Sequence, residues 1–218
     1  MNQEVDLRVT LQTIYDRLHA HFGPTHWWPG NNPFEIAVGA ILTQNTAWTN
    51  VEKAIDNLKA LDLLQPQAIV KVDSETLEQA LRPSGYFRQK AKRLKIFAQY
   101  LLDHYDGSMA ALAQRPQEAL REELLDLHGI GPETADDILL YACEHPVFVI
   151  DTYTRRILSR HGLVEDTIAY QDLQELFHTH LPRDLHTYRE YHGLLVYTAK
   201  EFCKTKANCE GCPLAELL

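Results

Sequence analysis

LDLHGIGPETADDILLYACEHPVFVIDTYTR, residues 125–155, is the stretch that decides the fold. A hairpin with two glycines, Gly129 and Gly131, lies between two helical patterns, and glycine allows φ values that side chains disfavour. Pro132 suits the first turn of the helix that follows. Backbone amides at such a turn, with the helix dipole behind them, favour a phosphate. The stretch therefore predicts a contact that positions DNA without reading its sequence.

Asp151 follows an apolar run, residues 147–150, and precedes another helical pattern. Two interpretations of this aspartate are open. Aspartate is among the preferred N-caps, so Asp151 can simply start the helix. An isolated acid that follows a DNA-anchoring hairpin is also a candidate for catalysis, and the pairing with the hairpin favours that role.

These residues resemble the helix-hairpin-helix DNA glycosylases, the superfamily of endonuclease III. In that family the pattern LxGIGxxTA, followed by a valine and an aspartate, marks the DNA-anchoring hairpin and the catalytic residue. Here the pattern falls on Leu127, Gly129, Gly131, Thr134, Ala135, Val149 and Asp151. The resemblance implies an all-α fold with two lobes that share a cleft. One lobe of six helices would span residues 27–145, and the other would combine residues 1–26 with residues 146–218.

The chain has 218 residues and a formal net charge of −9, which argues against a generic nucleic-acid coat protein. Yet residues 82–95 hold six cations and no acid, so one face can still be basic. No stretch is long and apolar enough to span a bilayer, and no signal peptide is recognised. We expect a cytoplasmic monomer, associated with the nucleoid in a bacterium and without a membrane partner.

Helical periodicity predicts helices over residues 3–22, 34–42, 48–61, 90–105, 170–180 and 185–202, with two short helices within residues 64–81. Four polar residues, TQNT at 43–46, interrupt this pattern. Taken alone, Gln44 is a turn or capping residue. The resemblance implies instead that Gln44 inserts into the duplex and fills the space left by an extruded nucleotide, because a stacked base hides its glycosidic bond.

Adjacent tryptophans in the loop HWWPGNNP, residues 26–33, are either packed residues or binding aromatics. The Trp27-Trp28-Pro29 segment, AILTQNT at 40–46 and RPSGY at 82–86 resemble the bacterial endonuclease III-like 3-methyladenine glycosylases. That resemblance implies a base pocket formed by Trp27, Trp28, Pro29 and Trp48. Alkylated purines are cationic, and aromatic faces attract cations.

The helix over residues 90–105 is expected to turn Lys90, Lys92, Arg93 and Lys95 outward. Such a face is either simply solvated or a track for phosphates. A similar segment lines the DNA groove in the family, which favours the track and makes Arg88 and Lys90 candidate DNA contacts.

Glu133 occupies the position where bifunctional members of the superfamily carry a lysine that attacks the sugar. A carboxylate cannot form the Schiff base, although it also suits the first turn of a helix. The sequence therefore predicts a monofunctional enzyme in which ionised Asp151 stabilises the developing cation and orients water.

Cys203, Cys209 and Cys212 resemble the iron-sulfur loop of endonuclease III, with two departures. The first spacing is one residue shorter, and the fourth ligand position falls on Leu218. Three alternatives stay open: a 4Fe-4S cluster whose fourth ligand is not identified, a zinc site completed by a histidine, or a loop without metal. The cluster is the preferred prediction.

The predicted function is a monofunctional DNA glycosylase of base excision repair. Its expected partner is double-stranded DNA with a damaged base, of the 3-methyladenine type. Alternatives are an endonuclease III-like glycosylase for oxidised or mismatched pyrimidines, and a module that binds DNA lesions without catalysis.

Overall fold

Helices are the only regular elements in the part of the chain that the computed structural model describes, residues 6–30 and 32–217. The prediction of an all-α fold is therefore confirmed. None of these helices combines the length and the apolar character that a membrane span requires. The chain divides into two units, a first of Met1–Trp28 with Pro146–Leu218 and a second of Pro29–His145. Trp27 and Trp28, which we expected at the start of the second unit, belong to the first.

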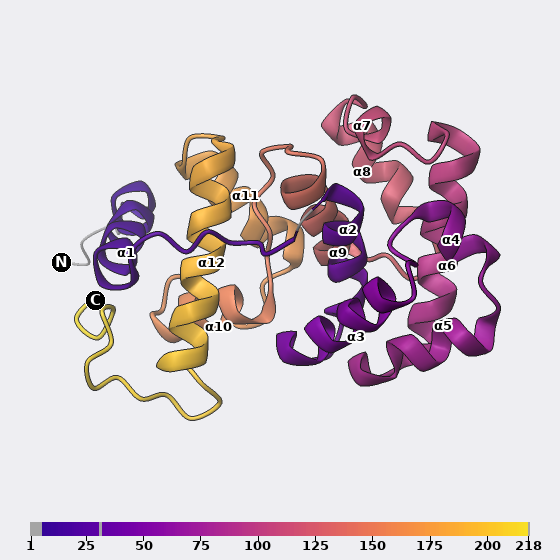
Figure 1. Cartoon of the computed structure of the whole chain (residues 1–218). Coiled ribbons are helices and arrows are strands. Elements are labelled where there is room, and N and C mark those ends of the chain that lie inside the picture. The colour runs from indigo at the N-terminus through magenta and orange to yellow at the C-terminus, as the bar shows by residue number, and fades with distance from the viewer. Residues whose placement is uncertain (1–5, 31, 218) are drawn as a thin grey trace. The chain divides into compact units, whose positions relative to one another are not determined.

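The first unit is organised around its longest helix, α12 (Leu185–Glu201). Two other helices, α1 (Leu7–Phe22) and α10 (Thr152–Arg160), pack against it, and α1 also contacts α11 (Tyr170–His180) (Figure 1). Eight of the nine residues of α12 from Tyr188 to Val196 are buried. A helix buried this widely can position groups on several of its faces.

Aromatic side chains form much of the first unit's core. Phe148 stacks on Phe177 with ring centroids 3.8 Å apart. Tyr191 of α12 packs edge-on against both rings and donates its hydroxyl to the Leu11 carbonyl at 2.8 Å. Because this buried hydroxyl is satisfied, the aromatic cluster joins α12 to α1 without the penalty of an unpaired polar group.

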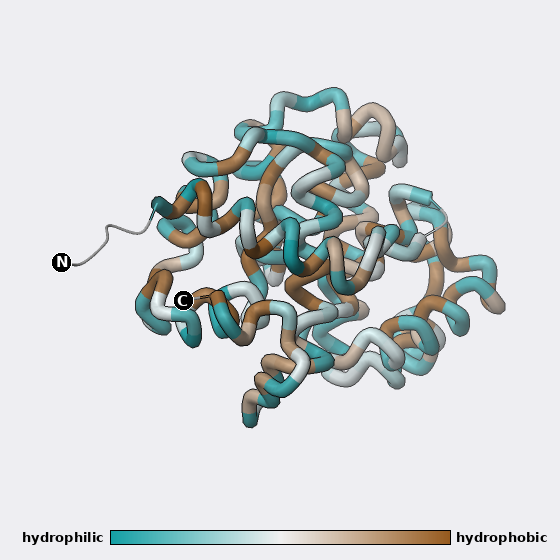
Figure 2. The backbone as a smooth tube through the Cα atoms, turned by 90° about the vertical axis from the view of Figure 1, so that its left-hand side faces the viewer, coloured by the Kyte–Doolittle hydropathy of each residue, from teal (hydrophilic) through white to brown (hydrophobic). Residues whose placement is uncertain are grey.

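The second unit is a set of helices around α2 and α6. Its elements are α2 (Pro33–Leu42), α3 (Trp48–Ala60), α4 (Pro66–Lys71), α5 (Ser74–Leu81), the 3-10 helix η1 (Arg82–Ser84), α6 (Phe87–Tyr105), α7 (Met109–Leu112), α8 (Gln117–Leu125), α9 (Pro132–Asp137) and the π-helical turn η2 (Ile138–Ala142). Buried residues lie on every face of α2, whereas α6 alternates buried and exposed positions. Hydrophilic residues in teal and hydrophobic residues in brown alternate along the backbone in Figure 2.

Short polar side chains begin many of the helices, which explains why the predicted starts lie close to the observed ones. The capping residues that accept a hydrogen bond from a first-turn amide are Asp6, Asn32, Asp73, Ser108, Asp151 and Asp184. Each satisfies an amide that the helix itself cannot pair.

Two helices differ from the prediction at their ends. The basic helix begins at Phe87 rather than at residue 90, and the first helix begins at Leu7, with residues 3–5 outside the described part. The helix after the hairpin ends in a wider turn, because the Cys143 amide donates to the Ile138 carbonyl at 2.9 Å. A single π turn of this kind carries no signal in hydrophobic periodicity.

Candidate active site

Asp151 is the N-cap of α10, so the capping interpretation is confirmed. Its Oδ1 accepts a hydrogen bond from the Thr154 amide at 2.7 Å. Its Oδ2 lies 3.6 Å from Nε2 of His192 on α12. Capping therefore employs one oxygen and leaves the other beside the histidine. The catalytic role of Asp151 stays a prediction that this arrangement allows.

The surroundings of Asp151 favour its ionised form. Its side chain is 12% exposed, and that of His192 is 5% exposed. Burial raises the pKa of Asp151, but the His192 interactions and the Thr154 hydrogen bonds together lower it by more. The net pKa lies below the ordinary value of 3.8. The Asp151 carboxylate is therefore charged at neutral pH.

His192 is the residue that sequence reasoning missed. Its side chain is buried. Nothing near it in the sequence shows that it lies against Asp151, because that contact depends on how α12 packs against α10. The spacing of one acid and one distant histidine carries no periodic signal.

Trp27 lies against the other end of α12. Its ring packs edge-on to Tyr197 with centroids 5.9 Å apart, and the Lys200 ammonium lies 5.5 Å from its ring centroid. The Trp28 ring packs edge-on against the Trp27 ring, with centroids 6.1 Å apart. Both indoles are half-buried. Packing against α12 thus buries part of the Trp27 ring. The base-binding role of both tryptophans stays a prediction.

Pro29 and Trp48, the other two residues of the predicted base pocket, line one hollow in the second unit. Three carboxylates and two ammonium groups share its lining: Glu35, Glu52, Asp56, Lys53 and Lys59. Lys59 pairs with the buried Glu35 at 2.7 Å. The hollow is therefore aromatic and slightly acidic, which suits a planar cation better than an anion.

The glycine hairpin is present, but its two glycines have different roles. Gly129 has φ +90°, and a Cβ there would lie 2.3 Å from Nε of Arg93. Gly131 is the N-cap of α9 with φ −98°, and a Cβ there would meet no atom within 4 Å. The expectation that both positions need glycine's freedom is therefore wrong for Gly131, whose backbone any residue can adopt. Pro132 opens α9 as predicted.

Gln44 joins the turn after α2 to the hairpin. Its Nε2 donates to the Gly129 carbonyl at 3.1 Å and to Oγ1 of Thr134 at 2.9 Å. Its Oε1 accepts a hydrogen bond from the Arg93 guanidinium. We call Gln44, Arg93, Gly129 and Thr134 the hairpin clasp. In this state the amide of Gln44 is engaged on both sides, so insertion into a duplex requires these bonds to be exchanged.

Lys90 does not point outward, and this part of the predicted basic face is wrong. Its side chain is 1% exposed, and Nζ donates to the carbonyls of Leu42 and Ser84 at 2.9 and 2.6 Å. Burial, together with the charge of Arg93, lowers the pKa of Lys90 to about 8. Lys90 thereby links the end of α2 to the turn before α6. The two carbonyls there need a hydrogen-bond donor, which explains why a cation is buried.

Other cations of the segment also have partners in the second unit. Lys95 donates to the Val72 carbonyl at 2.5 Å, at the end of α4. Arg88 is 77% exposed, and its Nε lies 3.6 Å from Glu78. Lys92 is exposed. The exposed cations are therefore fewer than the periodicity predicted, and a DNA contact by Arg88 stays a prediction.

Glu133 lies in the first turn of α9, where its charge suits the helix dipole. It is exposed, and α9 contains no lysine. That Glu133 stands where bifunctional members carry a lysine stays a prediction from the sequence resemblance.

An arginine holds the start of the C-terminal loop that carries the cysteines. Arg160 of α10 donates to Sγ of Cys203 at 3.2 Å and to the carbonyls of Lys204 and Thr205 at 2.6 and 2.8 Å. Burial raises the pKa of Cys212, and the charges of Cys209 and Cys203 raise it further. Even so, no three potential ligands gather into a metal site within residues 6–30 and 32–217. Leu218, where the fourth ligand position falls, lies outside the described residues.

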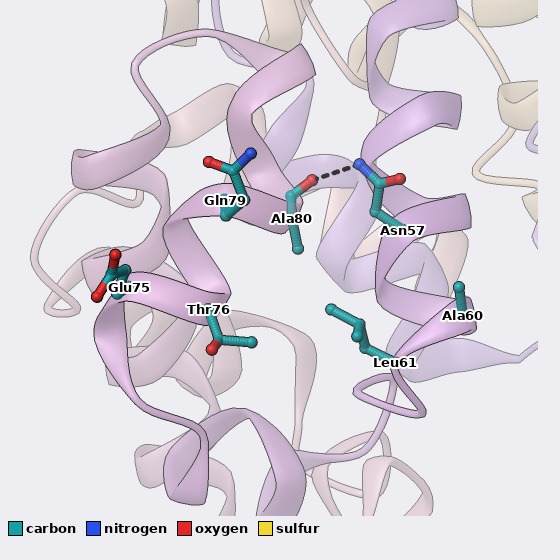
Figure 3. Close-up of a pocket in the computed structure, with 7 residues that line it drawn as sticks. All are labelled: Asn57, Ala60, Leu61, Glu75, Thr76, Gln79 and Ala80. Atoms are coloured by element: carbon teal, nitrogen blue, oxygen red, sulfur yellow. Dashed lines mark hydrogen bonds between the residues drawn. The ribbon is translucent and has the colours of Figure 1, made fainter.

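A second hollow of the second unit contains none of the predicted site residues. It lies between α3 and α5, where Asn57 donates to the Ala80 carbonyl at 2.9 Å (Figure 3). Its lining of Leu61, Thr76 and Gln79 carries a single carboxylate, Glu75. It offers no aromatic surface for a base.

Comparison with known proteins matches the family model "HhH-GPD superfamily base excision DNA repair protein" over residues 38–183. The chain is 45% identical over 205 residues to a putative DNA repair glycosylase, MJ1434, of Methanocaldococcus jannaschii, covering 93% of each. It is 32% identical over 182 residues to endonuclease III of Thermotoga maritima, covering 83% of this chain and 80% of the relative.

Among solved structures, the H. pylori 3-methyladenine DNA glycosylase MagIII bound to 1,N6-ethenoadenine superposes with a TM-score of 0.78. The two chains are 30% identical, and the match covers 90% of this chain and 98% of that one.

Proposed function

This chain belongs to the HhH-GPD superfamily of base excision DNA repair proteins and is a DNA glycosylase, and we propose that it releases alkylated purines such as 3-methyladenine from duplex DNA. In this proposal the enzyme acts as a monomer on DNA that contains a damaged base. It hydrolyses the glycosidic bond and leaves the strand intact.

The observation that carries this proposal is the fixed and largely enclosed carboxylate of Asp151. One of its oxygens is fixed by the Thr154 amide, and the other faces His192. A fixed negative charge stabilises the positive charge that develops on the sugar as the base departs. The Asp151 oxygen that faces His192 can accept a proton from the attacking water. His192, which touches the carboxylate rather than the substrate, orients that oxygen.

Glu133 supports the monofunctional part of the proposal. Strand cleavage in this superfamily needs an amine that attacks the sugar, and a carboxylate cannot form that imine. Water is then the nucleophile, and the product is a free base with an abasic strand that breaks only in alkali.

The alkylated-base specificity rests on the aromatic and slightly acidic hollow of Pro29 and Trp48, and on the likeness to the H. pylori glycosylase. A cationic base gains from an aromatic face and from nearby carboxylates. The endonuclease III of Thermotoga maritima favours a second candidate, a glycosylase for oxidised or mismatched pyrimidines.

The experiment compares base release from duplexes that bear 3-methyladenine, an oxidised pyrimidine or a mismatched pyrimidine. Strand breaks are scored before and after alkali, and borohydride is added to trap any imine. We expect free 3-methyladenine, strand breaks only after alkali and no trapped adduct. A trapped adduct would contradict the argument from Glu133, and release of the pyrimidine alone would favour the second candidate.

The DNA contacts proposed for this enzyme are the hairpin amides at Gly129 and Gly131, Thr134, Gln44 and Arg88. Lys90 is left out, because its ammonium is engaged inside the protein. Gln44 reaches the duplex only after the hairpin clasp opens, so the proposal couples DNA binding to a rearrangement of Arg93.

An iron-sulfur cluster at Cys203, Cys209 and Cys212 stays a proposal about the C-terminal loop, and no step of the reaction depends on it. Iron and zinc analysis of the purified protein separates the three alternatives. Stoichiometric iron would favour the cluster, stoichiometric zinc the histidine-completed site, and neither metal a loop held by Arg160 alone.

A further inference from the structure

A buried carboxylate on α12 holds the loop that carries the paired tryptophans. Oε2 of Glu190 accepts hydrogen bonds from the backbone amide and the hydroxyl of Thr25, at 2.6 and 3.1 Å. Its Oε1 accepts a hydrogen bond from the His26 amide at 3.1 Å. Glu190 is 3% exposed. Burying a carboxylate is costly unless it is well paired, and three donors on two oxygens provide that pairing.

Gly193, one turn further along α12, lets the same loop approach the helix closely. A Cβ at this position would lie 2.7 Å from Oγ1 of Thr25 and 2.8 Å from Cβ of Trp27. Glycine inside a helix is destabilising relative to alanine, so its presence here has a packing reason. Because residues three apart share one helix face, Glu190 and Gly193 act on the same loop.

His192 lies between Glu190 and Gly193 in the sequence, and it faces Asp151 rather than the aromatic loop. Its Nε2 is 3.6 Å from Oδ2 of Asp151. Three residues within one turn of α12 therefore lie against the predicted catalytic carboxylate or the start of the aromatic loop. All of these contacts lie within the first unit.

We propose that Glu190, His192 and Gly193 are positioning residues that fix the Trp27 indole relative to the Asp151 carboxylate. This inference rests on the proposed function and assigns these three residues the task of setting where an extruded base meets the carboxylate. A misplacement of about 1 Å in such an arrangement can cost on the order of 100-fold in rate. The distance between the Trp27 indole and the Asp151 carboxylate also sets the selectivity among bases. If the indole moves, a different base comes within reach of the carboxylate.

Two variants disturb the loop by different means. Glu190→Gln replaces one acceptor oxygen with an NH2 group that faces an amide donor, so at least one of the three hydrogen bonds is lost. Gly193→Ala leaves Glu190 and Asp151 unchanged and pushes Thr25 and Trp27 away from the helix, while raising the helix propensity of α12. Glu201→Gln, an exposed position on the same helix, is the matched control.

The first readout is single-turnover base release from a 3-methyladenine duplex. We expect a loss of about 10-fold or more in the maximal rate for both variants. The DNA concentration for half-saturation and the circular dichroism of the helices should stay unchanged, and Glu201→Gln should match the wild type. Wild-type rates in folded Glu190→Gln and Gly193→Ala would overturn the proposal.

The second readout does not require activity. The chain has three tryptophans, so their indole N–H resonances can be resolved by NMR and the Trp27 signal assigned with Trp27→Phe. We expect that signal to move in both loop variants and to stay in place in Glu201→Gln. If the wild type released no base from any duplex, the proposed function would fail while a moved signal still supported the positioning. An unmoved signal in both loop variants would overturn the positioning itself.

Discussion

The surroundings of Asp151 and of Gln44 hold their key side chains in opposite ways. Asp151 is fixed by a helix cap and by a buried histidine, and its charge is favoured before any substrate arrives. Gln44 is fixed by exchangeable hydrogen bonds to Arg93, Gly129 and Thr134. A charged group that must stabilise a transition state gains from being preorganised. A side chain that must enter a duplex has to be able to leave its partners.

The difference implies that the two regions respond differently to substitution. Changes around Asp151 should lower the rate of the chemical step and leave DNA affinity in place. Changes in the hairpin clasp should alter DNA affinity or stability and leave the chemical step in place once DNA is bound. Each of the following outcomes sharpens this contrast or breaks it.

The largest effect on stability is expected at Gly129. Gly129→Ala places a side chain at φ +90° and against Arg93, so it should destabilise the protein by about 3 kcal/mol. Gly131→Ala is the matched control, because its backbone is extended and its Cβ meets nothing, and it should stay within about 0.5 kcal/mol of the wild type. Urea unfolding measures both. Equal losses at the two glycines would refute the distinct roles assigned to them.

His192→Ala is expected to lower the base-release rate by about 10- to 100-fold with unchanged DNA affinity. The histidine contributes to the low pKa of Asp151, so its removal should raise that pKa and shift the acid limb of the pH–rate profile to higher pH. His186→Ala, exposed on the same helix, serves as the control. An unshifted acid limb would mean that His192 fills space in the core without lowering the pKa of Asp151.

The hairpin clasp can be tested by a double-mutant cycle of Gln44→Ala and Arg93→Ala. Because the two side chains share a hydrogen bond, we expect a coupling of about 1.5 kcal/mol in the free energy of unfolding. In the presence of saturating DNA the coupling should shrink, since Gln44 then leaves Arg93. A coupling of the same size with bound DNA would show that the clasp stays closed.

The smallest effect concerns Lys90 and pH. Its pKa is lowered from 10.5 to about 8 in the folded protein, so between these values the unfolded chain binds more protons. Stability from this group therefore rises as pH increases through that interval, and Tm rises with it. Lys90→Met should be less stable and lack this rise, whereas the exposed Lys92→Met should keep it. Melting curves from pH 7 to 10 give the comparison.

Much of the fold followed from local rules that the sequence displays. The helices over Pro33–Leu42 and Tyr170–His180 begin and end close to the predicted residues. The Asn32 cap, Pro33 and apolar periodicity agree for the first helix, whereas apolar periodicity alone marks the second. The cap at Asp151 was predictable for the same reason. Local rules failed at Lys90, since a lysine in a helical pattern is assigned to the outer face and only the packed structure shows carbonyls that need a donor.

The long-range contacts could not be predicted. His192 meets Asp151, Glu190 meets Thr25 and Arg160 meets Cys203 through the packing of helices that are far apart in the chain. None of these pairs has a spacing that a periodic pattern could reveal. The sequence indicated which motif carries the chemistry, whereas the residues that position it emerged from tertiary structure.

The most direct test of the central claim is the single-turnover release of 3-methyladenine by Asp151→Asn. Asparagine can still cap α10, so this variant removes the charge and keeps the fold. Asp73→Asn, which alters the corresponding cap of α5, is the control. The account predicts a loss of about 100- to 1,000-fold for Asp151→Asn and no loss for Asp73→Asn. Wild-type release by folded Asp151→Asn would contradict the claim that this carboxylate carries the reaction.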